Sequence, residues 1–220
     1  WGHSITSGID TIDYYISSKY YENEESQKFY SEKLILQDSL CTYYREDTFM
    51  NKYNTKKELN LPENKTILFF LQNIKKLSQK YLDVLLQISK RIKNCVILLS
   101  KYGLEEETIE KLKQKFNNCL IFFETCDLQK YNSLIYNSDL FLEPYPFGTC
   151  NGSLEAFSKG KIVISYPFEQ LPGRFTYGFY KKMNIMEPIV NSYKEYVDKT
   201  VYYIENPEKR KEIENQILKQ

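Results

Sequence analysis

Five short apolar runs recur between residues 66 and 165, and polar, helix-forming stretches separate them. The runs are TILFFL (66–71), CVILL (95–99), CLIFF (119–123), DLFLE (139–143) and KIVIS (161–165). They lack the alternation of a half-exposed strand, which is typical of parallel strands buried on both faces. Strands of this kind alternating with helices predict an α/β fold with a Rossmann-like, doubly wound parallel sheet.

The stretches between the runs carry the helical period. Residues 78–92 predict an amphipathic helix that begins at Ser78, and residues 105–116 predict a second one with acids in its first turn and lysines in its last. The apolar face of the first helix consists of Tyr81, Leu85, Ile88 and Ile92, and that of the second of Ile109, Leu112 and Phe116. Further helices are expected at about 174–184, 192–205 and 207–219.

The first third of the chain departs from this pattern. Two β-like runs, IDYYIS (12–17) and KLILQ (33–37), flank a polar stretch expected to be loop and helix. Residues 38–65 are polar, weakly periodic and closed by Pro62, which is typical of a connector between domains. We therefore predict a domain boundary at residues 62 and 63.

Composition narrows the class of partner. Of 220 residues 42% are hydrophobic, which is enough for a sizeable core, and 30 basic residues are interspersed with 29 acidic ones. No apolar run approaches the roughly 20 residues of a membrane span, and no signal peptide is evident. The five cysteines are odd in number and form no CxxC pair, which indicates a reducing compartment. We expect a cytoplasmic protein without a nucleic-acid or membrane partner.

Glycine and proline gather at one joint between a strand and a helix, PYPFGTCNGS (144–153). Doubly wound sheets bind ligands where such loops lead into helices, and backbone N–H groups at a helix start favour phosphate. Gly152 allows close approach and an unusual φ, and Asn151 and Ser153 can cap the helix or donate hydrogen bonds. The joint therefore predicts a diphosphate site, although an Asn-Gly pair is also an ordinary turn. Neither GxxxxGK[ST] nor a GxGxxG after a strand is present, which argues against P-loop and dinucleotide sites.

The segment DLFLEPYPFGTCNGSLEAFSKGKIVISYPFEQLPGRFTYGFYKKMNI resembles the nucleotide-sugar-binding segment of O-GlcNAc transferase-type glycosyltransferases. Three more stretches match in order, WGHSITSGIDTIDYYISS, YSEKL (30–34) and FFLQNIKK (69–76). The resemblance implies a GT-B fold, in which two Rossmann-like domains face each other across a cleft. Residues 1–62 would be the tail of the acceptor-side domain with the connector, and residues 63–220 the UDP-sugar-binding domain. The chain would then be a fragment, with the acceptor contacts and the catalytic base upstream of Trp1.

The resemblance also assigns residues. It places Gln72 and Lys75 at the nucleotide diphosphate, where the Lys75 ammonium would stabilise the charge that grows on the leaving group. Lys75 is otherwise an ordinary solvated lysine of the KK pair. Asn151, Gly152 and Ser153 would hold the same oxygens. The resemblance implies no metal or other cofactor, and the chain has no D-x-D triplet.

Four other side chains are less sharply assigned. Glu155, expected in the first turn of the helix, matches the ribose-binding acid of the family or is a favourable acid at a helix start. Tyr131 stands where related enzymes often have a histidine near uracil, and its ring can stack on a base. Arg174 can touch the donor sugar or pair with Glu169. His3, the only histidine, has no carboxylate or cysteine nearby in the sequence, and the family's histidine maps upstream of it.

The resemblance thus implies a UDP-sugar-dependent inverting glycosyltransferase that transfers a sugar, N-acetylglucosamine in the family, to Ser or Thr of proteins. Its partners would be the UDP-sugar donor and a protein or peptide acceptor. The Asn-Gly-Ser loop replaces the consecutive threonines of O-GlcNAc enzymes, so the donor sugar stays open. One alternative is a module that binds nucleotide sugars or a protein without catalysis. Another is an epimerase acting on UDP-N-acetylglucosamine, which would need acid and base carboxylates among Glu143, Glu155 and Glu169.

Overall fold

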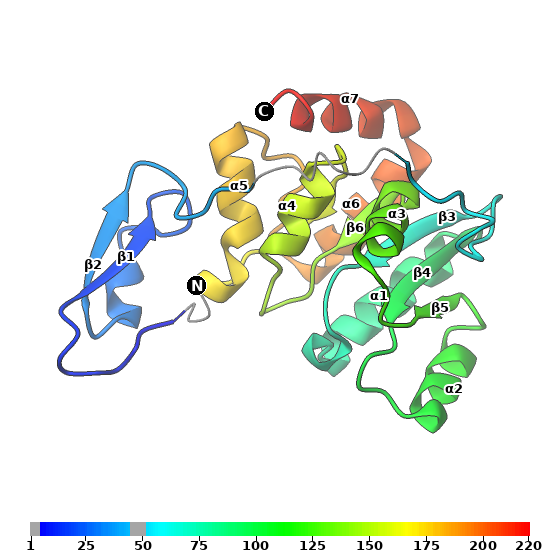
Figure 1. Ribbon diagram of the computed structural model, residues 1–220, viewed down its shortest axis with the longest axis horizontal. Helices are drawn as coiled ribbons and strands as arrows, with labels where there is room; N and C mark the ends of the chain where they lie inside the picture. Colours follow the sequence, from blue (N-terminus) through cyan, green and yellow to red (C-terminus); the bar gives the residue numbers. More distant parts are fainter. Residues whose placement is uncertain (1–4, 45–51) are drawn as a thin grey trace.

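The computed structural model describes residues 5–44 and 52–220, so His3 lies outside the described residues (Figure 1). The larger of its two sheets has the strand order β5-β4-β3-β6-β7, and every neighbouring pair is parallel. Its strands are β3 (Thr66–Phe70), β4 (Cys95–Ser100), β5 (Leu120–Phe123), β6 (Leu140–Leu142) and β7 (Val163–Ile164). Each predicted apolar run forms one strand, so the predicted doubly wound parallel sheet is confirmed.

Helices cover both faces of this sheet. Figure 1 shows α3 and α4 in front of the sheet and α1 and α6 behind it. The helices are α1 (Gln79–Arg91), α2 (Glu106–Lys115), α3 (Leu128–Asn137), α4 (Asn151–Phe157), α5 (Phe175–Met183), α6 (Tyr193–Glu205) and α7 (Pro207–Ile217), with short 3-10 turns η1 (Ser26–Phe29), η2 (Ile74–Lys76) and η3 (Leu171–Gly173). The chain first builds outward from β3 through β4 to β5, then returns through α3 to place β6 on the other side of β3. The strand order therefore reverses between β3 and β6, which is a topological switch point.

The predicted start and buried face of α1 are confirmed. The Ser78 hydroxyl accepts a hydrogen bond of 3.2 Å from the Tyr81 backbone N–H, as an N-cap does. Tyr81, Leu85 and Ile88 are fully buried. The Tyr81 hydroxyl lies 2.9 Å from that of Tyr196 on α6, so the two helices behind the sheet are joined by a hydrogen bond within their apolar contact.

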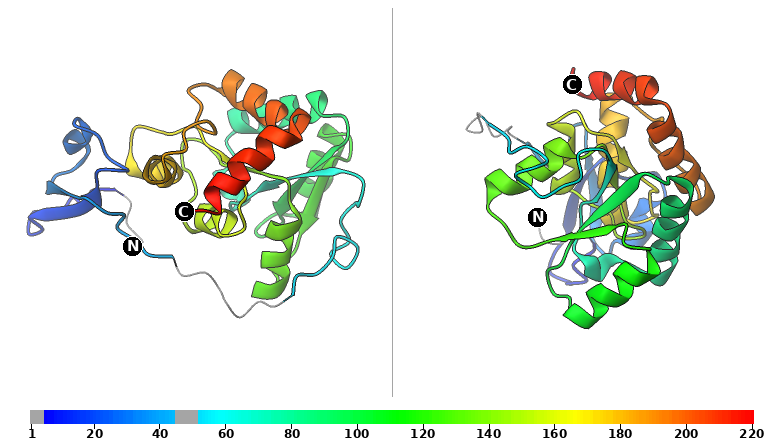
Figure 2. Two further views of the ribbon diagram at one scale, coloured as in Figure 1. Left: turned by 90° about the horizontal axis from the view of Figure 1, so that it is seen from above. Right: turned by 90° about the vertical axis from the view of Figure 1, so that its right-hand side faces the viewer.

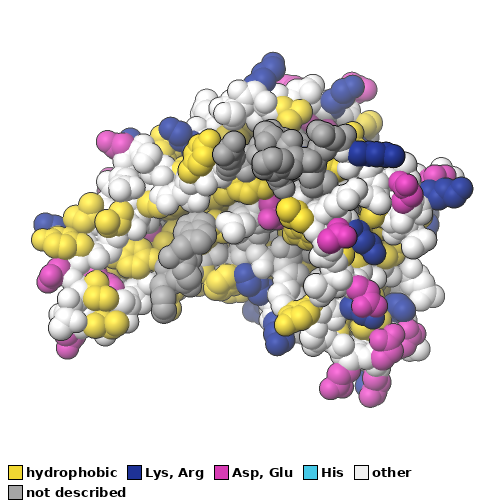
Figure 3. Space-filling model, viewed as in Figure 1, with side chains coloured by type: hydrophobic (Ala, Val, Ile, Leu, Met, Phe, Trp, Pro, Cys, Tyr) yellow, Lys and Arg dark blue, Asp and Glu magenta, His cyan; other side chains and the backbone are white. Residues whose placement is uncertain are grey.

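The smaller unit is a two-stranded parallel sheet of β1 (Tyr14–Ser18) and β2 (Lys33–Gln37), which confirms both strands predicted there. Figure 2 shows that it projects from the main body. Tyr14 and Ile16 are each 60% exposed and Ile16 pairs with Ile35, so one face carries uncovered apolar side chains. Figure 3 shows hydrophobic side chains gathered over this unit, at the left of the view. Parallel sheets are normally covered on both faces, so this face is unusual.

Tyr21 joins the small unit to the main body. Its ring is buried and packs edge-on against Phe175 and Phe179 of α5, with centroid distances of 5.2 and 5.8 Å. Gly178 makes this approach possible, because a Cβ built there would lie 2.2 Å from Tyr21 Cδ1. The Arg174 guanidinium donates to the Tyr21 carbonyl oxygen, so packing and hydrogen bonding act at the same point.

We predict that Gly178→Ala destabilises the chain by about 1–3 kcal/mol, because the added methyl group overpacks the contact with Tyr21. At an open helical position the same change would stabilise the helix. The free energy of unfolding from urea titration provides the measurement. In a Tyr21→Ala background the cost of Gly178→Ala should largely disappear, and an equal cost in both backgrounds would contradict the proposed contact.

Candidate functional site

Two adjoining cavities open beside the switch point, at the carboxyl edge of the sheet. The first has a volume of about 440 Å³ and is lined by Leu71, Gln72, Lys76, Tyr131, Phe147, Thr149, Cys150, Asn151, Gly152, Glu155 and Phe175. The second, of about 380 Å³, is lined by the ends of β3, β4 and β5 and by the segments that follow them. Both are lined by Leu71, Gln72 and Tyr131, so they form one cleft, which we call the switch-point cleft.

The structure brings five of the eight predicted site residues together in this cleft. They are Gln72, Tyr131, Asn151, Gly152 and Glu155. They come from the end of β3, from α3 and from α4, and are as far as 83 positions apart in the sequence, counting from Gln72 to Glu155. Their convergence is therefore a product of the parallel sheet and not of local sequence.

Gly152 is required by close packing. A Cβ at this position would lie 2.7 Å from the Thr149 Oγ1 atom and 3.4 Å from the Leu71 carbonyl oxygen. The expected close approach is thus present, but the unusual φ is not: Gly152 is helical and is not among the glycines with positive φ. A side chain here would push the end of β3 away from α4 and fill the cleft.

The lysine in the cleft is Lys76, whereas Lys75 points elsewhere. Lys75 is exposed, and its Cε atom lies 3.4 Å from the Cβ position of Gly103, in the loop after β4. Lys76 Nζ donates to the Gly148 carbonyl oxygen at 3.4 Å and lies 3.8 Å from the centre of the Phe147 ring. Successive residues of the 3-10 turn η2 point about a third of a turn apart, which separates the two lysines. The sequence did not single out Lys76 as a residue of this cleft, although the KK pair was the signal that could have identified it.

The environment of Lys76 sets its charge. Burial lowers the pKa of Lys76 to about 8, while Glu143 and Cys150 act in the opposite direction. Near neutral pH most Lys76 side chains still carry their proton. The cleft therefore contains a half-buried ammonium group whose solvation by water is incomplete, and an anionic ligand would be stabilised there.

Glu155 and Tyr131 form a pair across the cleft. The Tyr131 hydroxyl and the Glu155 carboxylate interact electrostatically, and burial raises the pKa of Glu155. The sequence predicted Glu155 in the first turn of α4. In the structure it lies in the second turn, and the first turn of α4 contains no acid. The reading of Glu155 as a helix-start acid was thus wrong. Its carboxylate remains available as an acceptor at the cleft.

Two predicted site residues are turned away from the cleft. Ser153 is fully buried, and its hydroxyl lies 2.6 Å from that of Thr176 on α5. The Arg174 guanidinium donates to the carbonyl oxygens of Tyr21 and Phe168 and lies 4.8 Å from the centre of the Tyr177 ring. Arg174 thus joins the two units, and its hydrogen-bond partners are carbonyl groups and not Glu169, which was one of the two partners considered from the sequence.

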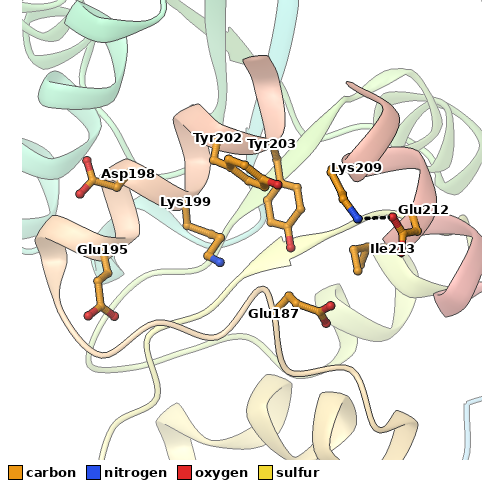
Figure 4. A pocket seen from close by; sticks show the side chains of 9 residues that line it. All are labelled: Glu187, Glu195, Asp198, Lys199, Tyr202, Tyr203, Lys209, Glu212 and Ile213. Carbon is orange, nitrogen blue, oxygen red and sulfur yellow. Dashed lines mark hydrogen bonds and ion pairs between the residues drawn. The ribbon is translucent and has the colours of Figure 1, made fainter. Parts of the chain in front are cut away.

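A separate cavity with several charged side chains contains none of the predicted residues. It has a volume of about 460 Å³ and lies between α6, α7 and the segment around Glu187 (Figure 4). Figure 4 shows acidic and basic side chains converging from both helices, with Lys209 paired to Glu212 at 2.6 Å. Charges of both signs line it side by side, so it offers no net preference for an anion. The switch-point cleft is the better candidate site.

The chain is similar to glycosyltransferases of known sequence and structure. No family model matches the chain. Two curated proteins named UDP-glucose:protein N-beta-glucosyltransferase, from serotypes 5b and 7 of Actinobacillus pleuropneumoniae, are each 23% identical to it over 225 residues. The match covers 99% of this chain and 36% of each relative, so the chain spans little more than a third of their length.

Solved structures define the fold. An O-GlcNAc transferase mutant from Thermobaculum terrenum superimposes with a TM-score of 0.84 at 16% identity, over 98% of this chain and 42% of that one. Sucrose-phosphate synthase from Thermosynechococcus elongatus gives a TM-score of 0.55 at 16% identity, over 76% of this chain and 44% of that one. The fold is therefore of the GT-B glycosyltransferase type, and the resemblance to O-GlcNAc transferase-type enzymes is confirmed for the fold. Among the described residues, no helix is long and apolar enough to span a membrane.

We predict that Lys76→Met stabilises the chain at pH 7 by about 1 kcal/mol, a value discounted for the partial exposure of the lysine. The folded-state pKa of Lys76, about 8, lies below its ordinary value of 10.5, so the folded chain disfavours the ammonium form. This penalty is fully present below pH 8 and disappears as the pH rises towards 10.5.

Chemical denaturation between pH 7 and pH 10 tests this. The gain from Lys76→Met should shrink as the pH rises, whereas the matched Lys75→Met variant should stay within about 0.5 kcal/mol of the parent at both pH values. A destabilising Lys76→Met at pH 7 would show that the contacts of Lys76 with Gly148 and Phe147 outweigh its desolvation.

Proposed function

We propose that this chain is the donor-binding part of a UDP-sugar-dependent protein glycosyltransferase. The single observation that carries the proposal is the position of Lys76. Its ammonium lies in the switch-point cleft of a GT-B-type fold, against the loop that follows β6. Ligands of doubly wound sheets bind at this edge, and a nucleoside diphosphate is the ligand class that combines two negative groups with an aromatic base.

The two halves of the cleft suit the two ends of such a donor. The half under Tyr131, Phe123 and Tyr102 is largely apolar and aromatic, as stacking on a base requires. The half at Lys76 and Gly152 exposes an ammonium and a backbone without a Cβ, as a diphosphate requires. Glu155 lines the Lys76 half near Tyr131, which lines both halves, and its carboxylate can accept hydrogen bonds from ribose hydroxyls.

In the proposed reaction the acceptor attacks C1 of the sugar in one displacement, which inverts that carbon. The bond from C1 to the diphosphate oxygen breaks, and negative charge grows on the leaving UDP. Lys76 lies where it can stabilise that charge, in the role that the sequence had given to Lys75. We propose that no metal is needed for this step, because a fixed ammonium supplies the positive charge. The base that assists the acceptor would come from polypeptide outside this chain.

The proposal also concerns which sugar is transferred and which atom of the protein accepts it. The sequence resemblance favours N-acetylglucosamine and Ser or Thr hydroxyls of proteins. The names of the two curated relatives favour glucose and a protein nitrogen instead. Both readings share UDP and a protein acceptor, so we propose a UDP-hexose donor and test the two sugars separately. The epimerase alternative receives no support, because it needs an acid and a base, and of its three candidate carboxylates Glu155 alone lines the cleft.

The domain boundary belongs to the same proposal. Residues 1–62 would be the end of the acceptor-side domain, and residues 63–220 the donor-binding domain. The bare apolar face of β1 and β2 supports this, since further strands or helices of a larger parallel sheet would cover it. We also propose a cytoplasmic location, because all five cysteines are free thiols.

We predict that UDP binds the 220-residue chain without divalent metal, and that Lys76→Ala weakens binding about tenfold or more by removing a charge-assisted contact. Lys75→Ala is the matched control, being the neighbouring residue with the same charge, and should leave the affinity nearly unchanged. Isothermal titration calorimetry in EDTA and again in Mg²⁺ gives the dissociation constants. Equal losses in both variants, or binding only with Mg²⁺, would contradict the proposed site.

Transfer is tested in the full-length protein that carries this sequence. UDP-glucose and UDP-N-acetylglucosamine are offered with an acceptor peptide, and mass spectrometry follows the added sugar. Lys76→Ala should lower kcat by about a hundredfold or more if the ammonium stabilises the leaving group in the transition state. UDP binding without transfer of either sugar would favour the non-catalytic alternative.

A further inference from the structure

Glu143 is a buried carboxylate that the proposed reaction does not use. It follows β6 directly, is 2% exposed, and lies under the loop of residues 144–150 that forms one wall of the switch-point cleft. Its Oε1 atom accepts hydrogen bonds from the Thr149 backbone N–H at 2.7 Å and from the Thr176 hydroxyl at 2.5 Å. A buried carboxylate is costly unless such partners compensate it, so its presence requires a reason.

The loop is held from both sides at adjacent peptide groups. On the buried side of the loop, the Glu143 carboxylate accepts a hydrogen bond from the Thr149 backbone N–H. From the cleft, the carbonyl oxygen of Gly148 accepts from Gln72 Nε2 at 3.2 Å and from Lys76 Nζ at 3.4 Å. The peptide that joins Gly148 to Thr149 is therefore fixed at both its polar atoms, and its orientation determines where the Lys76 ammonium rests.

Gly148 makes the contact with Glu143 possible. A Cβ at Gly148 would lie 2.5 Å from the Glu143 Oε1 atom. The same carboxylate reaches the far wall of the site, because Thr176, its second donor, lies 2.6 Å from the Ser153 hydroxyl of α4. Loop, α4 and α5 thus meet at one carboxylate.

Several other groups act on this carboxylate electrostatically, and burial raises the pKa of Glu143 to about 7. The ionisable groups that interact with it from the surrounding elements are Lys76, Tyr81, Cys150, Tyr180 and Tyr196. Lys76 is the one cation in this set and favours the ionised carboxylate.

We propose that Glu143 is the positioning residue of the donor site: its hydrogen bonds to Thr149 and Thr176 fix the loop of residues 144–150 so that Lys76 faces the bound diphosphate. This inference rests on the proposed function for the identity of the ligand. Glu143 touches neither donor nor acceptor and acts through the loop. Removing its acceptor oxygen would leave the Thr149 N–H unpaired, and the loop would turn that group towards water and displace the Gly148 carbonyl.

Three variants test the role through UDP affinity. Glu143→Gln keeps an acceptor oxygen and the side-chain shape, and should bind UDP within about threefold of the parent. Glu143→Met keeps the length but has no strong acceptor, and should bind about tenfold or more weakly while a cooperative thermal transition shows that it is folded. Thr176→Val removes one donor, leaves Glu143 in place and should give an intermediate loss. Equal UDP affinity for Glu143→Met and the parent would overturn the proposal.

A second measurement does not depend on UDP or on the folding of any one variant. In a ¹H–¹⁵N NMR titration of the parent chain, the Thr149 amide proton should shift with a midpoint near pH 7, following the ionisation of Glu143. In Glu143→Gln this titration should vanish. A Thr149 amide proton that exchanges with water in the parent as fast as an exposed amide would overturn the proposal, because the hydrogen bond to Glu143 would then be absent. A parent chain that shows the titration but binds no UDP would contradict the proposed function and leave the anchoring of the loop supported.

Discussion

The reversal of strand order between β3 and β6 is the constraint on which the site depends. The segment after β3 leads to η2 and α1 behind the sheet, while the loop after β6 leads to α4 in front of it, so the two strand ends separate and leave space between them (Figure 1). Buried apolar residues on both faces of these strands hold this arrangement, with Ile67, Leu68 and Phe141 fully buried. The cleft exists because the core fixes the positions of the strands. The side chains that would bind the ligand lie in the segments that follow these strands.

The electrostatic field in this cleft depends more on the burial of its charged groups than on the number of charges in the chain. The chain carries a formal charge of only +1, and its many surface ion pairs contribute little individually. One lysine that is half removed from water, beside a carboxylate beneath the loop, gives the cleft a local field that the net charge does not reveal. The partly desolvated ammonium lowers the stability of the fold without a ligand and favours the binding of an anionic ligand. Binding sites commonly lower stability in this way.

Periodicity predicted the fold well because buried parallel strands and amphipathic helices leave direct patterns in the sequence. All seven strands, the Ser78 cap and the three closing helices lie where the sequence indicated them. The site was less predictable because side-chain direction depends on local backbone geometry. A 3-10 turn decides that Lys76 and not Lys75 enters the cleft, and the packing of α5 turns Ser153 and Arg174 away from it. Glu143 looked like one acid among three, since nothing in the sequence marks a carboxylate that bonds a backbone N–H six positions later.

The central claim is that the switch-point cleft holds the diphosphate of a nucleotide-sugar donor. A crystal structure of the chain with UDP tests it most directly. We predict electron density for the diphosphate between the Lys76 ammonium and residues 147–152, with the uracil ring near Tyr131. A diphosphate bound at Lys75, or in the cavity between α6 and α7, would contradict the account.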